Sequence, residues 1–243
     1  MLHEPDNKRS TVLHALLVGF LFTLLPWMVF AYEKLYDVSL AEYGILPRNI
    51  RHIYGIVTSP FLHADIWHLL SNSTPLFILT SFLFYFYKKF FWGVYSTVFL
   101  LSGFWTWLIG RPDFHIGASG VIYGLTSYIF FSGVWSKNYR LSALSMLTVF
   151  LYGSVVWGIF PMETHISWEG HLSGFIAGLV MSFYYKKQLP ARKKFDWELV
   201  DDQTEYVQVP VEEIENGVTV TRFIYVPKKN VINLDDYEPQ RMD

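Results

Sequence analysis

Six apolar segments, separated by polar or basic loops, constrain the fold of this chain more than any other feature. They cover about residues 11–32, 66–87, 90–110, 118–135, 141–160 and 170–185. A helix needs about 20 apolar residues to cross a bilayer, and each segment reaches or approaches that length. The first segment follows Lys8 and Arg9 but lacks a small-residue cleavage site, so we expect a retained helix. The sequence predicts an all-α membrane protein built as a six-transmembrane-helix bundle.

The Lys and Arg residues at the segment ends predict the orientation. Positively charged loops stay on the cytoplasmic side of a membrane. Eleven such residues of the first 195 fall on one side and four on the other, so we expect both termini in the cytoplasm. A minimal six-helix core without an organelle-targeting extension favours a bacterial inner membrane. The four residues on the outer side are Lys34, Arg48, Arg51 and Arg111.

The net charge changes sign along the chain. Residues 1–195 carry +6 and residues 196–243 carry −8. We therefore expect two parts, a membrane domain at 1–195 and an acidic cytoplasmic tail at 196–243. In the tail, β-branched alternation flanks Asn216-Gly217, a dipeptide typical of hairpin turns, so a small β-hairpin is indicated. The chain has no cysteine, which excludes disulfides and thiolate metal sites.

Four strongly polar side chains fall within the predicted helices, where such groups are costly and indicate a functional site. With a helix rise of about 1.5 Å per residue, His68 lies about 30 Å and Asn72 about 24 Å above the basic inner end of their helix. On the same scale Ser119 and His171 lie about 27 and 22 Å up. All four occupy the outer half of the bilayer on helices expected to run parallel. We therefore expect them to line one water-accessible cavity.

Ser119 and His171 have the chemistry of a catalytic dyad. A serine hydroxyl needs an adjacent base to become a good nucleophile, and a neutral imidazole is such a base. His68 and Asn72, at i and i+4, share a helix face and would donate hydrogen bonds to the oxyanion, as would the backbone N–H of Ser119. Small residues let membrane helices approach closely. The glycines with that spacing are Gly117, Gly120 and Gly124, and Gly170, Gly174 and Gly178.

Each of these residues also has a structural interpretation. Ser119 could serve helix packing, Asn72 an interhelical hydrogen bond, and either histidine could be a satisfied buried side chain. That interpretation must then explain four polar groups at one depth. A metal site is disfavoured, because His63 and His68 are five residues apart and no carboxylate lies nearby in the helices. A transporter would require charged pairs at mid-membrane, and the predicted helices contain none.

Three stretches in this order resemble the rhomboid intramembrane serine proteases. They are Thr-Ser-Pro-Phe-Leu-His leading to His-x-x-x-Asn at 58–72, Gly-Ala-Ser-Gly-Val-Ile-Tyr-Gly at 117–124, and Gly-His-Leu-Ser-Gly at 170–174. The likeness covers about residues 10–190. It implies that Ser119 is the nucleophile and His171 the general base. It also implies that His68 and Asn72 support the oxyanion hole and that Tyr123 stacks on the catalytic histidine.

The resemblance further implies the partners of the chain. Family members cleave single-pass transmembrane proteins near the outer surface, in contact with membrane lipid and without metal or cofactor. No nucleic acid is expected, and the oligomeric state stays open. The first loop, residues 33–65, looks like the family's membrane-embedded first loop but lacks the Trp-Arg pair that many members carry there. In the second helix, Thr80 and Phe84 stand where many members have a Gly and a Glu. A non-enzymatic rhomboid-like protein is the alternative, although such relatives typically lose the serine or the histidine.

Overall fold

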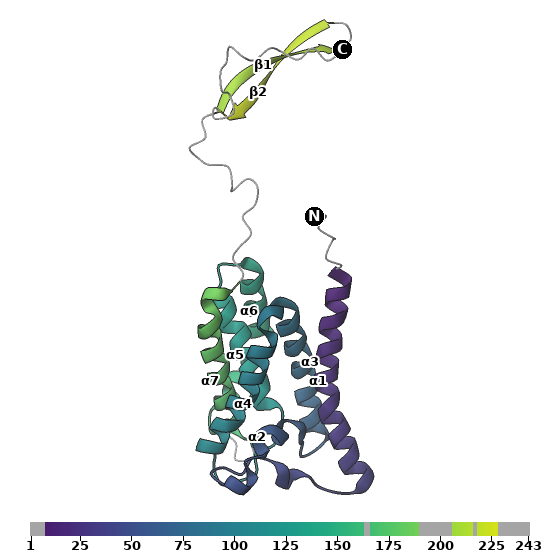
Figure 1. Cartoon of the computed structure of the whole chain (residues 1–243), viewed down its shortest axis with the longest axis vertical. Helices are drawn as coiled ribbons and strands as arrows, with labels where there is room; N and C mark the ends of the chain where they lie inside the picture. The colour runs from purple at the N-terminus through teal and green to yellow at the C-terminus, as the bar shows by residue number, and fades with distance from the viewer. Residues whose placement is uncertain (1–7, 163–165, 190–205, 216–217, 228–243) are drawn as a thin grey trace. The chain divides into compact units, whose positions relative to one another are not determined.

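The computed structural model describes residues 8–162, 166–189, 206–215 and 218–227 (Figure 1). The chain forms two compact units, residues 1–192 and 193–243. The described part of the first unit is a bundle of helices, and that of the second is a two-stranded sheet. Both the start of α1 and the end of α7 lie at the same end of the bundle (Figure 1).

Each predicted apolar segment coincides with a helix of the first unit. The predicted helices at these six places are therefore confirmed, although one of them is shorter than expected. Buried apolar side chains from α3 to α7 form one continuous core, in which Phe91, Leu125 and Ile129 are completely buried. The six helices are α1 (Lys8–Tyr36), α3 (Ile66–Phe86), α4 (Phe91–Ile109), α5 (Ser119–Trp135), α6 (Tyr139–Tyr152) and α7 (Trp168–Tyr185).

Three helical stretches in the described part are long and apolar enough to cross a membrane. They are Arg9–Tyr36, Ile66–Phe86 and Lys88–Ile109. The helices α5, α6 and α7 have 17, 14 and 18 residues. All three are shorter than the roughly 20 residues that usually cross a bilayer. Length and composition therefore support a helical membrane protein but do not by themselves give six spans.

The fifth predicted segment, residues 141–160, is not one α-helix. The helix α6 ends at Tyr152, whose backbone departs from helical values (φ −131°). A 3₁₀-helix, η5 (Gly153–Ile159), follows directly. This change of path directs the carbonyl group of Gly158 towards α7, where it contacts a histidine. The α-helix is thus shorter than the apolar run, because the end of that run contributes to a polar site.

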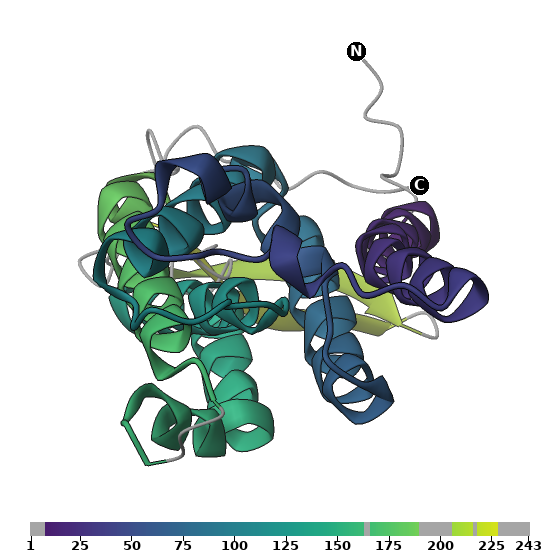
Figure 2. The same ribbon diagram turned by 90° about the horizontal axis from the view of Figure 1, so that it is seen from below.

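The first loop crosses the ends of the helices when the bundle is seen from below (Figure 2). The side chain of Arg48 donates hydrogen bonds to the carbonyl oxygens of Leu108 (3.3 Å) and Gly110 (2.8 Å), at the end of α4. The indole of Trp107 donates to the carbonyl oxygen of Asn49 (3.1 Å). The two Arg48 bonds satisfy carbonyl groups that the C-terminus of α4 leaves free. Arg48 and Trp107 thus fasten a loop that lacks the family's Trp-Arg pair. The short helices of the loop are η1 (Ala41–Tyr43), η2 (Ile50–His52), α2 (Gly55–Thr58) and η3 (Ser59–Phe61).

Glycine lets α5 and α7 pack backbone against backbone. A Cβ atom built on Gly174 would overlap the carbonyl oxygen of Gly120, and one on Gly178 would overlap that of Gly124. A Cβ on Gly120 would lie 3.3 Å from the carbonyl oxygen of Gly170. The two helices therefore approach more closely than side chains would allow.

We expect Gly174→Ala and Gly178→Ala to lower the thermal unfolding temperature of the purified protein in detergent. In both cases the added methyl group meets backbone atoms that cannot rotate away, so the helices must separate. Overpacking of this kind typically costs about 1–3 kcal/mol. Gly153→Ala is the matched control, because its Cβ meets only a side-chain atom of Val149, at 3.3 Å. Equal unfolding temperatures for the three variants would contradict this packing.

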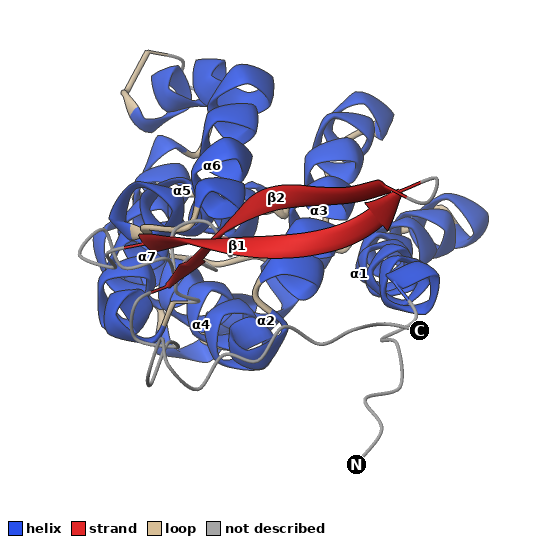
Figure 3. Cartoon of the chain, turned by 90° about the horizontal axis from the view of Figure 1, so that it is seen from above, coloured by secondary structure: helices blue, strands red, loops and turns tan. Residues whose placement is uncertain are grey.

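The second unit contains an antiparallel hairpin of β1 (Tyr206–Glu215) and β2 (Val218–Pro227), drawn in red in Figure 3. Val209 pairs with Ile224, and an exposed ion pair joins Arg222 to Glu213 at 3.4 Å. The predicted hairpin is confirmed, while its Asn216-Gly217 turn lies outside the described residues.

Candidate active site

Ser119 and His171 come together at the starts of two adjacent helices. Ser119 is the first residue of α5, and His171 lies in the first turn of α7. The close packing of α5 and α7 brings the Ser119 Oγ atom to 2.9 Å from the His171 Nε2 atom. The histidine is buried, with 9% of its surface exposed. A hydroxyl group and an imidazole therefore lie within hydrogen-bond reach in a largely enclosed place.

The second nitrogen of His171 fixes its tautomer. Its Nδ1 atom lies 2.9 Å from the carbonyl oxygen of Gly158. A carbonyl oxygen only accepts hydrogen bonds, so Nδ1 donates, and in the neutral ring Nε2 is the acceptor. The hydroxyl group of Ser119 consequently donates to Nε2. The Tyr123 ring stacks on the imidazole, with centroids 4.1 Å apart and planes 9° apart, and holds its orientation.

His68 and Asn72 direct nitrogen atoms at the backbone that leads into Ser119. A Cβ atom built on Gly117 would lie 2.7 Å from the His68 Nε2 atom and 3.5 Å from the Asn72 Nδ2 atom. The backbone of Gly117 has a φ of +109°, a value that favours glycine. The spacing of Gly117 predicted that it packs two helices, and the structure shows that it does not. It lies in the loop before α5, where the absence of a side chain leaves room for these donors.

The amide of Asn72 is held by a histidine that precedes α3. The Asn72 Nδ2 atom lies 3.1 Å from the His63 Nε2 atom, and because an amide nitrogen donates, Nε2 accepts. Burial, followed by the nearby His68, lowers the pKa of His63 to about 4, so its ring is neutral at physiological pH. An unfolded chain would protonate His63 below about pH 6.5. The folded state therefore loses stability relative to the unfolded chain as the pH falls from about 6.5 towards 4, because only the unfolded chain binds this proton there.

Asp65 sets where α3 begins. Its Oδ1 atom accepts hydrogen bonds from the backbone N–H groups of His68 (2.9 Å) and Trp67 (2.8 Å). These bonds, that of His68 first, lower the pKa of the Asp65 carboxyl group. An ionised side chain at this position caps the helix. The cap thereby places His68 and Asn72 in the first two turns of α3.

A cavity of about 720 Å³ is lined by residues at or near the starts of α3, α5 and α7. Five of the predicted site residues line it, and its volume lies in the range of ligand-binding pockets. The predicted residues in its wall are Ser119, His171, His68, Asn72 and Tyr123. The wall also contains charged or polar groups from the loops, namely Asp65, Arg111, Asp113, His115 and Ser167.

The sequence matches the Rhomboid domain family over residues 51–188, more than half of the chain and the stretch that contains these residues. The chain belongs to the rhomboid family. Rhomboids are serine proteases that act within membranes on transmembrane substrates, and this rhomboid is an integral membrane protein.

Relatives of this rhomboid occur in mycobacteria and in a giant virus. An uncharacterized protein of Mycobacterium tuberculosis is 32% identical over 183 residues, which cover 71% of this chain and 75% of the relative. One of Mycobacterium leprae is 31% identical over 207 residues, which cover 79% and 80%. A protein of Acanthamoeba polyphaga mimivirus named "Putative rhomboid protein" is 35% identical over 136 residues, which cover 53% and 72%.

The sequence interpretation missed two groups at this site. Gly158 contributes a backbone carbonyl, and the type of a residue does not predict such a contact. His63 was weighed only as a metal ligand, whereas its ring nitrogen contacts the Asn72 amide. The spacing of nine residues between His63 and Asn72 gave no sign of this contact, because His63 lies in the non-helical residues before α3, where helical spacing does not apply.

Proposed function

We propose that this rhomboid is a serine endopeptidase that uses a Ser119–His171 dyad to cleave peptide bonds in or near the transmembrane helices of single-pass proteins. The observation that carries the proposal is the 2.9 Å contact between Ser119 Oγ and His171 Nε2, with Nδ1 held by the carbonyl group of Gly158. The site thus contains a nucleophile, a base and a group that orients the base, each in contact with the next.

The proposed reaction follows from these positions. His171 Nε2 takes the hydroxyl proton as Ser119 Oγ attacks the substrate carbonyl carbon, forming a tetrahedral oxyanion. The protonated histidine then gives this proton to the leaving amine, and the C–N bond breaks to leave an acyl-enzyme. Water, deprotonated by the same histidine, hydrolyses the ester and restores Ser119.

The side chains of His68 and Asn72 are proposed to bind the oxyanion. Both nitrogens lie beside Gly117, two residues before the nucleophile, where the negative charge would develop. One hydrogen of the Asn72 amide is directed at His63, which leaves the second for the substrate oxygen. Donors fixed in this way need little reorganisation during the reaction.

The arrangement in the membrane is part of the proposal. Six spans, with both termini in the cytoplasm of a bacterium, are supported by the alternation of the helices and by the basic residues at one end of the bundle. A division into a membrane domain at 1–195 and an acidic tail at 196–243 is supported by the change in net charge. The site would then open near the outer surface.

A probe experiment tests the proposed activity directly. Purified protein in detergent is incubated with a fluorophosphonate, which reacts with activated serines, and separately with a single-pass model substrate. We expect covalent labelling at Ser119, located by mass spectrometry of the peptide, and cleavage of the substrate. Labelling at another serine, or intact substrate under conditions in which the protein is folded, would reject the proposed dyad.

The tail is expected to be dispensable for peptide-bond cleavage. Truncation after Lys194 should leave the cleavage rate of a model substrate within about threefold in detergent and in liposomes, because the proposed site lies about 22–30 Å from the inner helix ends. A fall of more than about tenfold, or about 1.4 kcal/mol, in a truncated protein that stays folded would show coupling of the tail to the site.

A further inference from the structure

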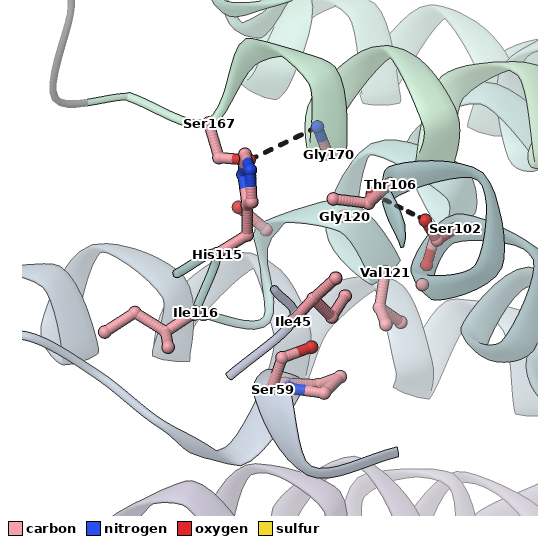
Figure 4. Close-up of a pocket in the computed structure, with 14 residues that line it drawn as sticks. Ile45, Ser59, Ser102, Thr106, His115, Ile116, Gly120, Val121, Ser167 and Gly170 are labelled. Carbon is pink, nitrogen blue, oxygen red and sulfur yellow. Dashed lines mark hydrogen bonds between the residues drawn. The ribbon is translucent and has the colours of Figure 1, made fainter. Parts of the chain in front are cut away.

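A second histidine–serine contact joins the two residues that precede the proposed dyad by four positions in the chain. His115 precedes Ser119 by four residues, and Ser167 precedes His171 by four. The His115 Nδ1 atom is 2.6 Å from the Ser167 Oγ atom. The same two stretches of chain are therefore joined twice, once at the dyad and once just before it. Figure 4 shows His115 and Ser167 beside the small cavity that they line with Gly170.

The hydrogen bonds of this contact have one consistent direction. The His115 Nε2 atom lies 3.0 Å from the carbonyl oxygen of Arg111, which can only accept, so Nε2 donates. In the neutral ring Nδ1 then accepts from the hydroxyl group of Ser167. The Ser167 oxygen itself accepts from the backbone N–H of Gly170 (3.3 Å) and so caps α7. A continuous chain of bonds links the loop before α5 to the first turn of α7.

A partly buried ion pair adds a second link between the same segments. The Arg111 Nε atom lies 3.5 Å from the Glu169 Oε1 atom, and the backbone N–H of Arg111 donates to that oxygen at 3.3 Å. Arg111 also donates to the carbonyl oxygen of Ile166. Glu169 is only 2% exposed, so its carboxylate depends on these partners for compensation of its charge.

The backbone of His115 is fixed on its other side as well. Its N–H and carbonyl groups pair with those of Ile45 in the first loop, both at 2.9 Å. His115 therefore contacts the first loop through its backbone and Ser167 at the start of α7 through its ring, so it links the positions of these two segments. The His115 side chain is only 5% exposed and is enclosed by these bonds, so it has few alternative rotamers.

From these contacts we infer that His115 and Ser167, supported by the Arg111–Glu169 pair, are positioning residues that hold Ser119 and His171 at reacting distance. The inference rests on the proposed dyad and adds residues that would not touch the substrate carbonyl. The physical reason is geometric. The start of α5 and the start of α7 each carry one reacting group, and a misplacement of about 1 Å at such groups can cost on the order of 10² in rate.

Two substitutions at the contact test this inference. His115→Phe keeps an aromatic ring and removes both nitrogens, whereas Ser167→Ala removes the hydroxyl group. We expect each to lower kcat about tenfold while KM for a single-pass substrate changes less than about twofold, and to slow fluorophosphonate labelling by the same factor. Ser167→Thr retains the hydroxyl and should restore labelling to within about threefold. The double variant should be slowed by less than the product of the two single effects, because both substitutions remove the bond between His115 and Ser167.

A buried serine elsewhere separates positioning from general stability. Ser145 in α6 donates to the carbonyl oxygen of Phe130 in α5 (2.9 Å) and lies outside the site. Ser145→Ala should lower the unfolding temperature to a similar degree as Ser167→Ala but keep its labelling rate. If rates follow unfolding temperature in all variants, or if His115→Phe and Ser167→Ala react like the wild type, the inference is overturned. Absence of labelling in the wild type itself would instead reject the dyad.

Discussion

Ser119→Ala is expected to lose covalent labelling and substrate cleavage together, because the alanine has no oxygen to attack the carbonyl group. Removal of the serine or histidine of a serine protease costs on the order of 10⁴–10⁶ in kcat, so cleavage should fall to background. His171→Ala should reach the same level, since Ser119 would keep its hydroxyl proton. Neither change adds an atom that could overlap a neighbour, and thermal unfolding in detergent checks that both variants remain folded.

The control for this prediction is Ser127→Ala. Ser127 is buried two turns further along α5, with 1% of its surface exposed, and does not line the cavity. This variant should be labelled and should cleave substrate like the wild type. Cleavage by Ser119→Ala above the background of empty membranes would show that another residue is the nucleophile.

His68→Ala and Asn72→Ala are expected to give the next largest effect. Loss of one oxyanion donor typically lowers kcat by on the order of 10²–10³, and KM should change little, because the donor acts mainly on the transition state. Initial rates with a purified single-pass substrate would separate kcat from KM. His63→Ala should have a smaller effect of the same kind, since it frees the Asn72 amide to rotate.

Ser73→Ala is the matched control for these donors. Ser73 follows Asn72 on α3, and its hydroxyl oxygen accepts from the Trp27 indole of α1 (2.9 Å), a contact between helices. The control should lower the unfolding temperature without a selective loss in kcat. If His68→Ala and Asn72→Ala lose no more kcat than Ser73→Ala at equal stability, their role is structural.

The sequence predicted the helices well, because long apolar runs bounded by basic residues leave few alternatives. It also predicted the hairpin, from alternation around Asn216-Gly217. The residues chosen for the site meet in one cavity because each lies near the start of α3, α5 or α7. Their height along the helix was therefore enough to group them.

Three features could not be predicted, because they depend on backbone geometry. The end of α6 at Tyr152 follows from the change to a 3₁₀ path, which an apolar run of 20 residues does not show. Gly117 was assigned to helix packing from its spacing, whereas its φ of +109° places it in a turn. The anchoring of the first loop by Arg48 depends on carbonyl groups of α4, which have no signature in sequence.

The carbonyl group of Gly158 has a consequence for the timing of catalysis. Because it belongs to η5 and not to α5 or α7, the base and its orienting group are carried by different elements. A movement of η5 away from α7 would remove the acceptor of Nδ1 and let the proton exchange between the two ring nitrogens. Ser119 would then face an N–H group for part of the time and could not be deprotonated. The position of η5 would therefore set the fraction of time for which His171 is in the tautomer that can accept the Ser119 proton.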